Sequence, residues 1–372
     1  MKSASFHETL KKFGIIFFSG VPDSLLKNFC AYVTRVVPEQ HVSAANEGAA
    51  VGLAIGHHLA TGSIPAVYMQ NSGLGNAVNP LVSLAHFDVY RIPMLLIIGW
   101  RGEPGLKDEP QHQVQGQITL PMLKTLGIPN LTISTNTDQN EIRAFLVENL
   151  SAESGPVAIV VSQDTFETDS QVSLSSSDLK LTRRTALESL LKILSKTDII
   201  ISTTGKLSRE LLAIRQSEND QQTDFLCVGG MGHASSIATG VAISSPRRRV
   251  FCLDGDGALQ MHLGAAATIG ELLPTNLIHL LFNNGSHESV GGQPVTAPNL
   301  NYQLLAEALG YKNQFFADDS DAISNAVLNC TIDTGPTFIE VFLKVGQDST
   351  LPRPNKTPLE NKRDFQKFLK GD

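Results

Sequence analysis

Short, continuously apolar segments alternate with helical patterns along this chain of 372 residues. The helical pattern over 47–62 ends at Gly62, a residue that commonly terminates helices. Segments that are apolar on both faces are typical of parallel strands covered by helices on both sides of a sheet. The alternation therefore predicts βαβ units and an α/β fold. In the first half the apolar segments are 15–20, 64–70, 94–100, 130–134 and 156–162.

The alternation breaks once, over a polar and serine-rich stretch at 165–184, and then resumes. We therefore expect two doubly wound parallel-sheet domains of similar size, 1–168 and 183–372, joined by a linker at 169–182. A polar tail ends the second domain. The second series of apolar segments is 198–205, 224–230, 250–257, 276–285 and 337–343.

The composition excludes several classes of protein. A formal net charge of −7 lacks the basic surplus of a general nucleic-acid binder. No apolar run reaches the roughly 18–20 residues that span a bilayer, and the first residues lack the pattern of a signal peptide. Cys30, Cys227, Cys252 and Cys330 form no CxxC pair. We expect reduced thiols that bind no metal, a cytoplasmic location, and neither nucleic-acid nor membrane partners.

The segment 250–257 carries an apolar strand directly into Asp-Gly-Asp-Gly. We expect a helix to open after Asp256, and the N–H groups at the start of such a helix can hold a phosphate. Gly257 would let that phosphate approach the backbone. A carboxylate at the mouth of the turn can hold a divalent cation that neutralises the phosphate. Taken alone, such a glycine and aspartate cluster is more often a surface turn.

A second strand, 276–285, ends in Asn-Asn-Gly, and 27 residues separate Asp256 from Asn284. That length allows one helix and one return strand, and the crossover places the ends of the two strands side by side. The Asn284 side chain and the carbonyl of Ser286 then offer further oxygen ligands next to Asp256. The two strand ends together favour a site for a divalent cation and a phosphate over a surface turn.

Asp-Gly-Asp-Gly, the spacer and Asn-Asn resemble the cofactor motif of the thiamine diphosphate-dependent decarboxylases. The resemblance implies that Asp256, Asn284 and the Ser286 carbonyl bind Mg²⁺. It also implies a pyrimidine-binding domain followed by a pyrophosphate-binding domain. Ala258 departs from the serine of many relatives, which leaves more of the diphosphate contact to backbone N–H groups. The implied cofactor contacts are Thr204 and Gly205 in a phosphate-proximal loop, the Gly229 carbonyl, Met231 beneath the cofactor, Gly257 and Ala258.

Glu47 opens a helix that carries few other charges. A glutamate at this place often only complements the helix dipole. The resemblance implies instead that Glu47 bonds the N1′ atom of the aminopyrimidine ring and promotes loss of the proton from C2 of the thiazolium ring. Met231 also has a simpler interpretation, which is that it fills the core beside a glycine-rich turn.

Longer stretches resemble the short two-domain phosphonopyruvate decarboxylases, with the sulfopyruvate enzymes as nearest sisters. The resemblance runs from about Phe13 to the tail and leaves no room for the middle domain of larger relatives. It implies decarboxylation of 3-phosphonopyruvate, a small anionic 2-oxo acid, to phosphonoacetaldehyde and CO₂ in phosphonate metabolism. It further implies a homo-oligomer, at least a dimer, with active sites at the subunit interface. The stretches are 19–29, 46–62, 68–81, 99–116 and 283–295.

The loop after the apolar segment 94–100 is expected to bind the substrate, because ligands of α/β sheets bind beyond the carboxyl ends of the strands. A phosphonate requires cations or several donors, and Arg101 and Lys107 supply positive charge in this loop. Both residues could equally be solvated loop charges. His112 is the first candidate for an active-site histidine and His287 the second, although His112 could merely bond a carbonyl.

Three further residues belong to the expected site. Asp23 matches the region of a catalytic aspartate in the family, with a helix N-cap as the alternative. Asn71 and Ser72 follow the apolar segment 64–70 and are expected to contact the cofactor or the substrate.

Several other functions remain to be separated from this one. The same chemistry could act on 3-sulfopyruvate or on another 2-oxo acid. A catalytically silent sensor of nucleotide or thiamine is a second alternative, but binding a diphosphate alone does not need Glu47. A dinucleotide-dependent dehydrogenase is disfavoured, because no GxGxxG motif opens a first βαβ unit.

Overall fold

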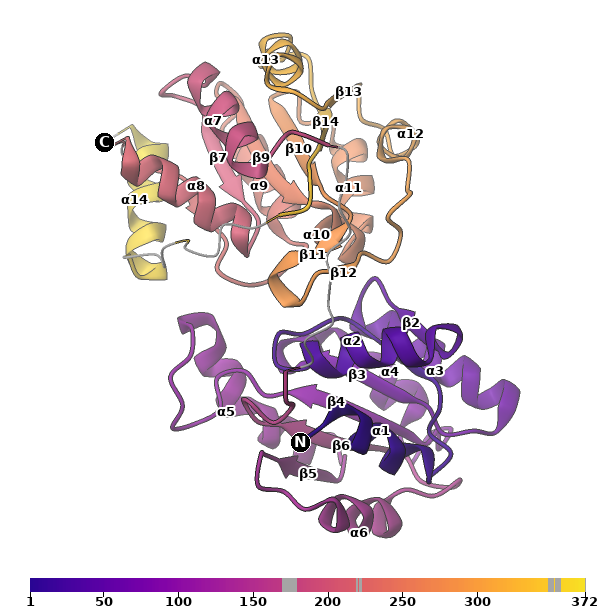
Figure 1. Ribbon diagram of the computed structural model, residues 1–372. Helices are drawn as coiled ribbons and strands as arrows, with labels where there is room; N and C mark the ends of the chain where they lie inside the picture. The colour runs from indigo at the N-terminus through magenta and orange to yellow at the C-terminus, as the bar shows by residue number, and fades with distance from the viewer. Residues whose placement is uncertain (169–178, 219, 221–222, 347–350, 352–355, 372) are drawn as a thin grey trace. The chain divides into compact units, whose positions relative to one another are not determined.

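The computed structural model describes residues 1–168, 179–218, 220, 223–346, 351 and 356–371 (Figure 1). The chain divides into two compact units, Met1–Ser173 with Ser289–Thr296, and Leu174–Glu288 with Ala297–Asp372. Most of the expected linker, residues 169–178, lies outside the described residues. None of the helices in the described ranges combines the length and the apolar character needed to cross a membrane.

The N-terminal unit contains a six-stranded parallel sheet in the order β2-β1-β3-β4-β6-β5. Its strands are β1 (Phe18–Gly20), β2 (His41–Ser43), β3 (Ala66–Gln70), β4 (Met94–Gly99), β5 (Asn130–Ile133) and β6 (Pro156–Val161). Its helices are α1 (Ser3–Lys11), α2 (Lys27–Val36), α3 (Glu47–Thr61), α4 (Leu74–Pro80), α5 (Pro110–Thr125) and α6 (Gln139–Asn149), with the short η1 (Pro38–Gln40), η2 (Asn71–Gly73) and η3 (Leu81–Ala85).

Helices cover both faces of this sheet, as the apolar strands predict. Leu95 and Ile97 of β4 pack in one core with side chains of α1, α2 and α6. Leu96 and Ile98 of the same strand pack in a second core with α3, α4 and α5. Successive residues of a strand point to opposite faces, so a strand buried on both sides must be continuously apolar.

The C-terminal unit contains a second six-stranded parallel sheet, in the order β13-β14-β10-β9-β7-β8. Its strands are β7 (Ile199–Ser202), β8 (Phe225–Leu226), β9 (Val250–Gly255), β10 (Leu277–Asn283), β13 (Asn313–Ala317) and β14 (Thr337–Phe342). Its helices are α7 (Arg183–Ile193), α8 (Lys206–Ser217), α9 (Ala234–Ser244), α10 (Asp256–Met261), α11 (Gly264–Leu272), α12 (Tyr302–Ala308), α13 (Ser320–Leu328) and α14 (Pro358–Lys370). The short elements β11 (Ser286–His287), η4 (Glu288–Val290) and β12 (Gln293–Pro294) follow β10 in the chain.

The two faces of the second sheet are also covered. Phe251 and Leu253 of β9 join a core with α7, α8 and α13. Cys252 joins the core on the other face with α9, α11, α12 and α14. The expected fold of two doubly wound α/β domains is therefore confirmed, and a middle domain is absent from the described residues.

The carboxyl ends of parallel strands lie at one edge of a sheet, where ligands of α/β folds bind. In the N-terminal unit, Asp23, Asn71 and Arg101 each lie within three residues of the carboxyl end of a strand, which is β1, β3 or β4 respectively. In the C-terminal unit, Thr204 and Asn284 lie in the loops after β7 and β10, and Asp256 begins α10 directly after β9. The order of the strands thus gathers most candidate residues at the functional edge of each sheet.

Three local features differ from the sequence expectation. The strands β2 and β13 lie at the edges of their sheets and are only partly buried, so their apolar pattern is weak. β1 begins at Phe18 rather than at residue 15. The single helix expected after Asp256 is two helices, because the backbone of His262, with φ −133° and ψ 51°, leaves the helical region.

Candidate active site

Asp256 is the first residue of α10, at the carboxyl end of β9. Its side chain is buried, and its two carboxylate oxygens accept hydrogen bonds from the backbone N–H groups of Gly257 and Gly285, both at 2.7 Å. The neighbouring turn is closed by a bond of 3.0 Å from the Ser286 N–H to the Asn284 side-chain oxygen. The three residues expected to bind Mg²⁺ are therefore carried by two adjoining turns.

The electrostatics of this turn suit a divalent cation. Burial raises the pKa of Asp256 to about 6, and the nearby carboxylate of Glu288 acts in the same direction. The carboxylate of Asp256, the amide of Asn284 and the carbonyl of Ser286 are all oxygen donors, the kind of ligand that Mg²⁺ prefers. A cation here would neutralise a buried negative charge whose hydrogen-bond donors are backbone N–H groups. The residues present thus fit the implied metal.

Gly257 brings further candidate residues together beside Asp256. A Cβ atom at this position would lie 2.6 Å from the His287 ring and 3.4 Å from the Met231 methyl carbon, so only glycine fits. Met231 lies against this turn and belongs to neither apolar core of the unit, as far as the described residues show. Burial lowers the pKa of His287 to about 4, which leaves its imidazole neutral near pH 7.

The remaining cofactor candidates of the C-terminal unit lie in turns at the ends of strands. Thr204 and Gly205 lie between β7 and α8, directly before the first residue of that helix. Gly229 lies between β8 and α9. Ala258 is buried in α10, where a larger polar side chain would have little access to solvent.

Glu47 is the first residue of α3, and the Asn46 side chain caps that helix by accepting the Ala49 N–H at 2.9 Å. Its carboxylate is only 5% exposed. Burial raises the pKa of Glu47, while a hydrogen bond of 2.8 Å from the Asn76 amide acts in the opposite direction. Gly73 leaves room for this carboxylate, since a Cβ there would lie 2.3 Å from an oxygen of Glu47. A buried acid with a raised pKa is suited to exchanging a proton.

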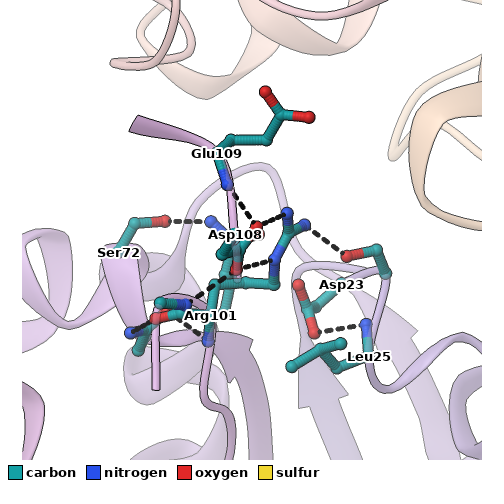
Figure 2. Close-up of polar contacts among 10 residues, drawn as sticks. Asp23, Leu25, Ser72, Arg101, Asp108 and Glu109 are labelled. Atoms are coloured by element: carbon teal, nitrogen blue, oxygen red, sulfur yellow. Dashed lines mark hydrogen bonds and ion pairs between the residues drawn. The ribbon is translucent and has the colours of Figure 1, made fainter. Parts of the chain in front are cut away.

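Asp23 follows β1 and is completely buried. One carboxylate oxygen accepts the Leu25 N–H group at 2.9 Å (Figure 2) and the Leu26 N–H group at 3.2 Å, so the residue closes the turn before α2. The other oxygen is buried without a hydrogen-bond partner among the described residues. Burial raises the pKa of Asp23, and the Arg101 guanidinium lowers it. Asp23 thus shapes a turn and also keeps one oxygen to which no described residue donates a hydrogen bond.

The Arg101 side chain is held by other protein groups (Figure 2). Its guanidinium donates two bonds to Asp108 and one of 2.9 Å to the Ser24 hydroxyl. Asp108 also accepts the Gly102 and Glu109 N–H groups, both at 2.7 Å. Two of the five N–H groups of Arg101 therefore close its own loop, and a third bonds the loop after β1.

The other residues of this edge differ in what they offer a ligand. The Asn71 amide donates to the Arg101 carbonyl and to Thr119, and accepts the Arg101 N–H, so it is bonded within the protein. Ser72 is exposed, and its hydroxyl accepts a bond from Gln70. Lys107 is exposed in the same loop. His112 is half-buried in the first turn of α5, and burial lowers its pKa, with the Arg101 charge acting in the same direction.

Comparison with known proteins identifies the family. Residues 3–122 match the family described as thiamine pyrophosphate enzyme, N-terminal TPP binding domain, and residues 204–341 match the corresponding C-terminal TPP binding domain. The chain belongs to the thiamine pyrophosphate enzymes. Glu47 lies within the first matched region, and Asp256 and Asn284 lie within the second. Thiamine pyrophosphate, which is thiamine diphosphate under its other name, is the cofactor of this enzyme.

Three relatives align with almost the whole enzyme. A phosphonopyruvate decarboxylase of Streptomyces viridochromogenes is 35% identical, over 96% of this chain and 92% of that protein. A phosphonopyruvate decarboxylase of Streptomyces hygroscopicus is 34% identical, over 95% and 90%. A sulfopyruvate decarboxylase of Methanosarcina acetivorans is 28% identical, over 97% and 96%. Within the thiamine pyrophosphate enzymes, this chain is thus a two-domain carboxy-lyase similar to these proteins.

Proposed function

We propose that this enzyme decarboxylates 3-phosphonopyruvate to phosphonoacetaldehyde and CO₂, with thiamine diphosphate and Mg²⁺ as cofactors. The observation that carries the proposal is that one chain holds both a buried acid with a raised pKa, Glu47, and an oxygen-lined turn at Asp256. The 34–35% identity to two phosphonopyruvate decarboxylases, against 28% to a sulfopyruvate decarboxylase, favours the phosphonate. The reaction would belong to phosphonate metabolism.

The cofactor would be held mainly by the C-terminal unit. Asp256, Asn284 and the Ser286 carbonyl would bind Mg²⁺, and the N–H groups of Gly257 and Ala258 would meet the diphosphate at the start of α10. Residues 1–168 would serve as the pyrimidine-binding domain and 183–372 as the pyrophosphate-binding domain. The remaining proposed contacts are Thr204, Gly205, the Gly229 carbonyl and Met231.

When bound, thiamine diphosphate supplies the carbon nucleophile and accepts the electrons that remain when CO₂ leaves. Glu47 would hold a proton at its carboxyl group and share it with N1′ of the aminopyrimidine ring. Its burial keeps water away from that proton. Asp23, with its unpartnered oxygen, and the half-buried His112 are the groups proposed to deliver protons to the product carbon. His287 would supply a neutral imidazole on the side of the C-terminal unit.

The substrate carries negative charge at both ends, so its site requires cationic side chains. Lys107 is the exposed cation proposed to bind the phosphonate. Arg101 keeps at most two N–H groups for a substrate, and we propose that it mainly orders the loop that carries Lys107. Asn71 would act on the same loop through its bonds to Arg101. Ser72 is the neighbouring residue whose exposed side chain could reach a ligand.

The assembly proposed here is a homodimer or a larger homo-oligomer. Helix α3, which Glu47 opens, exposes Leu53 and Leu59, at 41% and 71%. Helix α9, which begins three residues after Met231, exposes Ile237 and Ile243, at 37% and 55%. A second copy that covers these faces would bury apolar surface, as obligate interfaces do. Each active site would then combine the N-terminal unit of one subunit with the C-terminal unit of another.

A cytoplasmic location also remains part of the proposal. The four cysteines are free and buried, which suits a reducing compartment.

An aldehyde-detection assay tests the proposed reaction. Purified protein stripped of metal is supplied with phosphonopyruvate, sulfopyruvate or pyruvate, with and without thiamine diphosphate and Mg²⁺. We expect aldehyde from phosphonopyruvate at the highest kcat/KM, and only when both cofactors are present. Preferred turnover of sulfopyruvate would correct the substrate. Cofactor binding without turnover of any 2-oxo acid would favour the catalytically silent sensor.

A further inference from the structure

Arg183 occupies a buried position between two glutamates in the C-terminal unit. It is the first residue of α7, and its side chain is 11% exposed. Nε and Nη2 donate to the two carboxylate oxygens of Glu210, at 3.0 and 3.1 Å. Nη1 donates to Glu288 at 2.9 Å. The planar guanidinium thus joins two carboxylates that belong to different segments of the chain.

The two glutamates lie near two different parts of the candidate cofactor site, the phosphate-proximal loop and the segment that follows Asn284. Glu210 lies in the second turn of α8, the helix that begins directly after Thr204 and Gly205. Glu288 follows Ser286 and His287, and its second oxygen accepts the Gly346 N–H at 2.7 Å. Arg183 therefore connects the helix of the phosphate loop with the turn that presents the Ser286 carbonyl.

Folding stability alone does not account for this arrangement. Glu210 and Glu288 are 4% and 6% exposed, and Lys206 adds a second positive charge close to both. Burying so many charges costs several kcal/mol per ion before their attraction is counted, and apolar residues in such places are often equally stabilising. What a buried guanidinium adds is geometry, because its donors are fixed in one plane and hold their partners in one arrangement.

We propose that Arg183 is a positioning residue of the metal site, which fixes the turn 286–288 against helix α8 and thereby holds the Ser286 carbonyl in place. The inference rests on the proposed magnesium site. Groups that orient metal ligands from outside the ligand shell commonly change metal affinity on substitution by about tenfold to a hundredfold. Arg183 touches neither substrate nor proposed ligand atoms directly, so its effect must pass through Glu288.

Arg183→Lys separates geometry from charge. The ammonium of lysine keeps the positive charge but cannot bond both carboxylates with the planar fork of arginine. We expect the Kd for Mg²⁺, measured by isothermal titration calorimetry with thiamine diphosphate present, to rise about tenfold to a hundredfold. Turnover should return toward the wild-type value at saturating Mg²⁺, because the residues proposed for the chemistry are unchanged.

Arg215→Lys is the matched control. Arg215 lies in helix α8, which also carries Glu210, and its side chain is 15% exposed. It donates Nε and Nη2 to Asp224 and Nη1 to Asp220. Its bonding pattern repeats that of Arg183, but neither of its partners lies within two residues of a proposed metal ligand, as Glu288 does. We expect Arg215→Lys to lower the melting temperature of the protein by about as much as Arg183→Lys does. Its Kd for Mg²⁺ should nevertheless stay within twofold of the wild-type value.

Glu210→Gln provides a second variant if Arg183→Lys does not fold. It leaves residues 286–288 unchanged, and its amide can accept only one of the two hydrogen bonds that Arg183 donates to the Glu210 carboxylate. We expect a rise of severalfold in the Kd. An unchanged Kd in Arg183→Lys or Glu210→Gln, or an equal rise in Arg215→Lys, would overturn the inference. A wild-type protein that binds thiamine diphosphate without needing Mg²⁺ would instead overturn the metal site, and the positioning role with it.

Discussion

Two buried carboxylates open helices at the edges of two different sheets, and the protein holds them differently. Asp256 of α10 is bound by backbone N–H groups, among them those of Gly257 and Gly285. Glu47 of α3 receives one hydrogen bond from a side chain, that of Asn76. Backbone donors hold the Asp256 carboxylate in a fixed direction, which suits a group proposed to bind a cation. A single side-chain donor in a buried site leaves Glu47 able to gain and lose a proton.

The largest effect should come from the metal end. Asp256→Ala would remove the charged ligand proposed for Mg²⁺ and leave the diphosphate without a neutralising cation, so we expect cofactor retention to be lost. Equilibrium dialysis with thiamine diphosphate and Mg²⁺ measures this directly. Wild-type affinity in this variant would mean that Asp256 does not bind the metal.

Glu47→Gln should separate binding from chemistry. We expect near-normal cofactor affinity, because the amide keeps the shape of the side chain. The amide cannot supply the proton that N1′ is proposed to receive. Exchange of the C2 hydrogen for deuterium, followed by NMR, should slow by about a hundredfold or more. An exchange rate equal to that of the wild type would remove Glu47 from the mechanism. The proposed difference in role between Glu47 and Asp256 would then be wrong.

The central parts of both sheets could be predicted from the sequence. The strands β4 and β10 are buried along their whole length, so their apolar runs are unambiguous. The edge strands β2 and β13 are absent from the expected strands, because β2 is only three residues long and β13 has just three apolar residues after Asn313 and Gln314. The motif at Asp256 and Asn284 was readable because a parallel crossover links strand order to sequence spacing.

The residues that support the site could not be predicted in the same way. Asn76 reaches Glu47 across 29 positions, and Arg183 reaches Glu288 across 105. No local pattern marks such pairs, because they meet only when separate segments fold together. Arg101 shows the converse limit. Its charge was recognised from the sequence, but its bonds to Asp108 and Ser24 appear only in the folded loop.

Lys107→Ala tests a group that serves neither carboxylate. We expect unchanged cofactor affinity and unchanged C2 exchange, with a higher KM for phosphonopyruvate. A charge-assisted contact contributes about 1.5–3 kcal/mol, which corresponds to roughly tenfold to a hundredfold in affinity. Steady-state kinetics with pyruvate as the control substrate should show a much smaller change. Equal losses for both substrates would mean that Lys107 does not bind the phosphonate.

The smallest effect concerns stability. Burial raises the pKa of Glu47 above its ordinary value of 4.5. As pH rises from 4.5 toward the raised pKa, the unfolded chain loses this proton before the folded protein does, so the wild type loses stability over that window. Glu47→Gln has no such loss. We expect the cofactor-free variant to melt higher than wild type at pH 8, with little difference at pH 4. A difference that does not change with pH would show that Glu47 is not buried as described.

Complementation tests most directly whether the two carboxylates serve one cofactor from different subunits. Inactive Glu47→Gln and inactive Asp256→Ala proteins are mixed, and subunit exchange is verified by mass spectrometry. A hybrid dimer places both substitutions in one site and leaves the other site intact. We expect aldehyde formation to reappear, at up to about half the wild-type rate per hybrid dimer of this two-fold symmetric kind. No recovery after verified exchange would contradict a site shared between subunits.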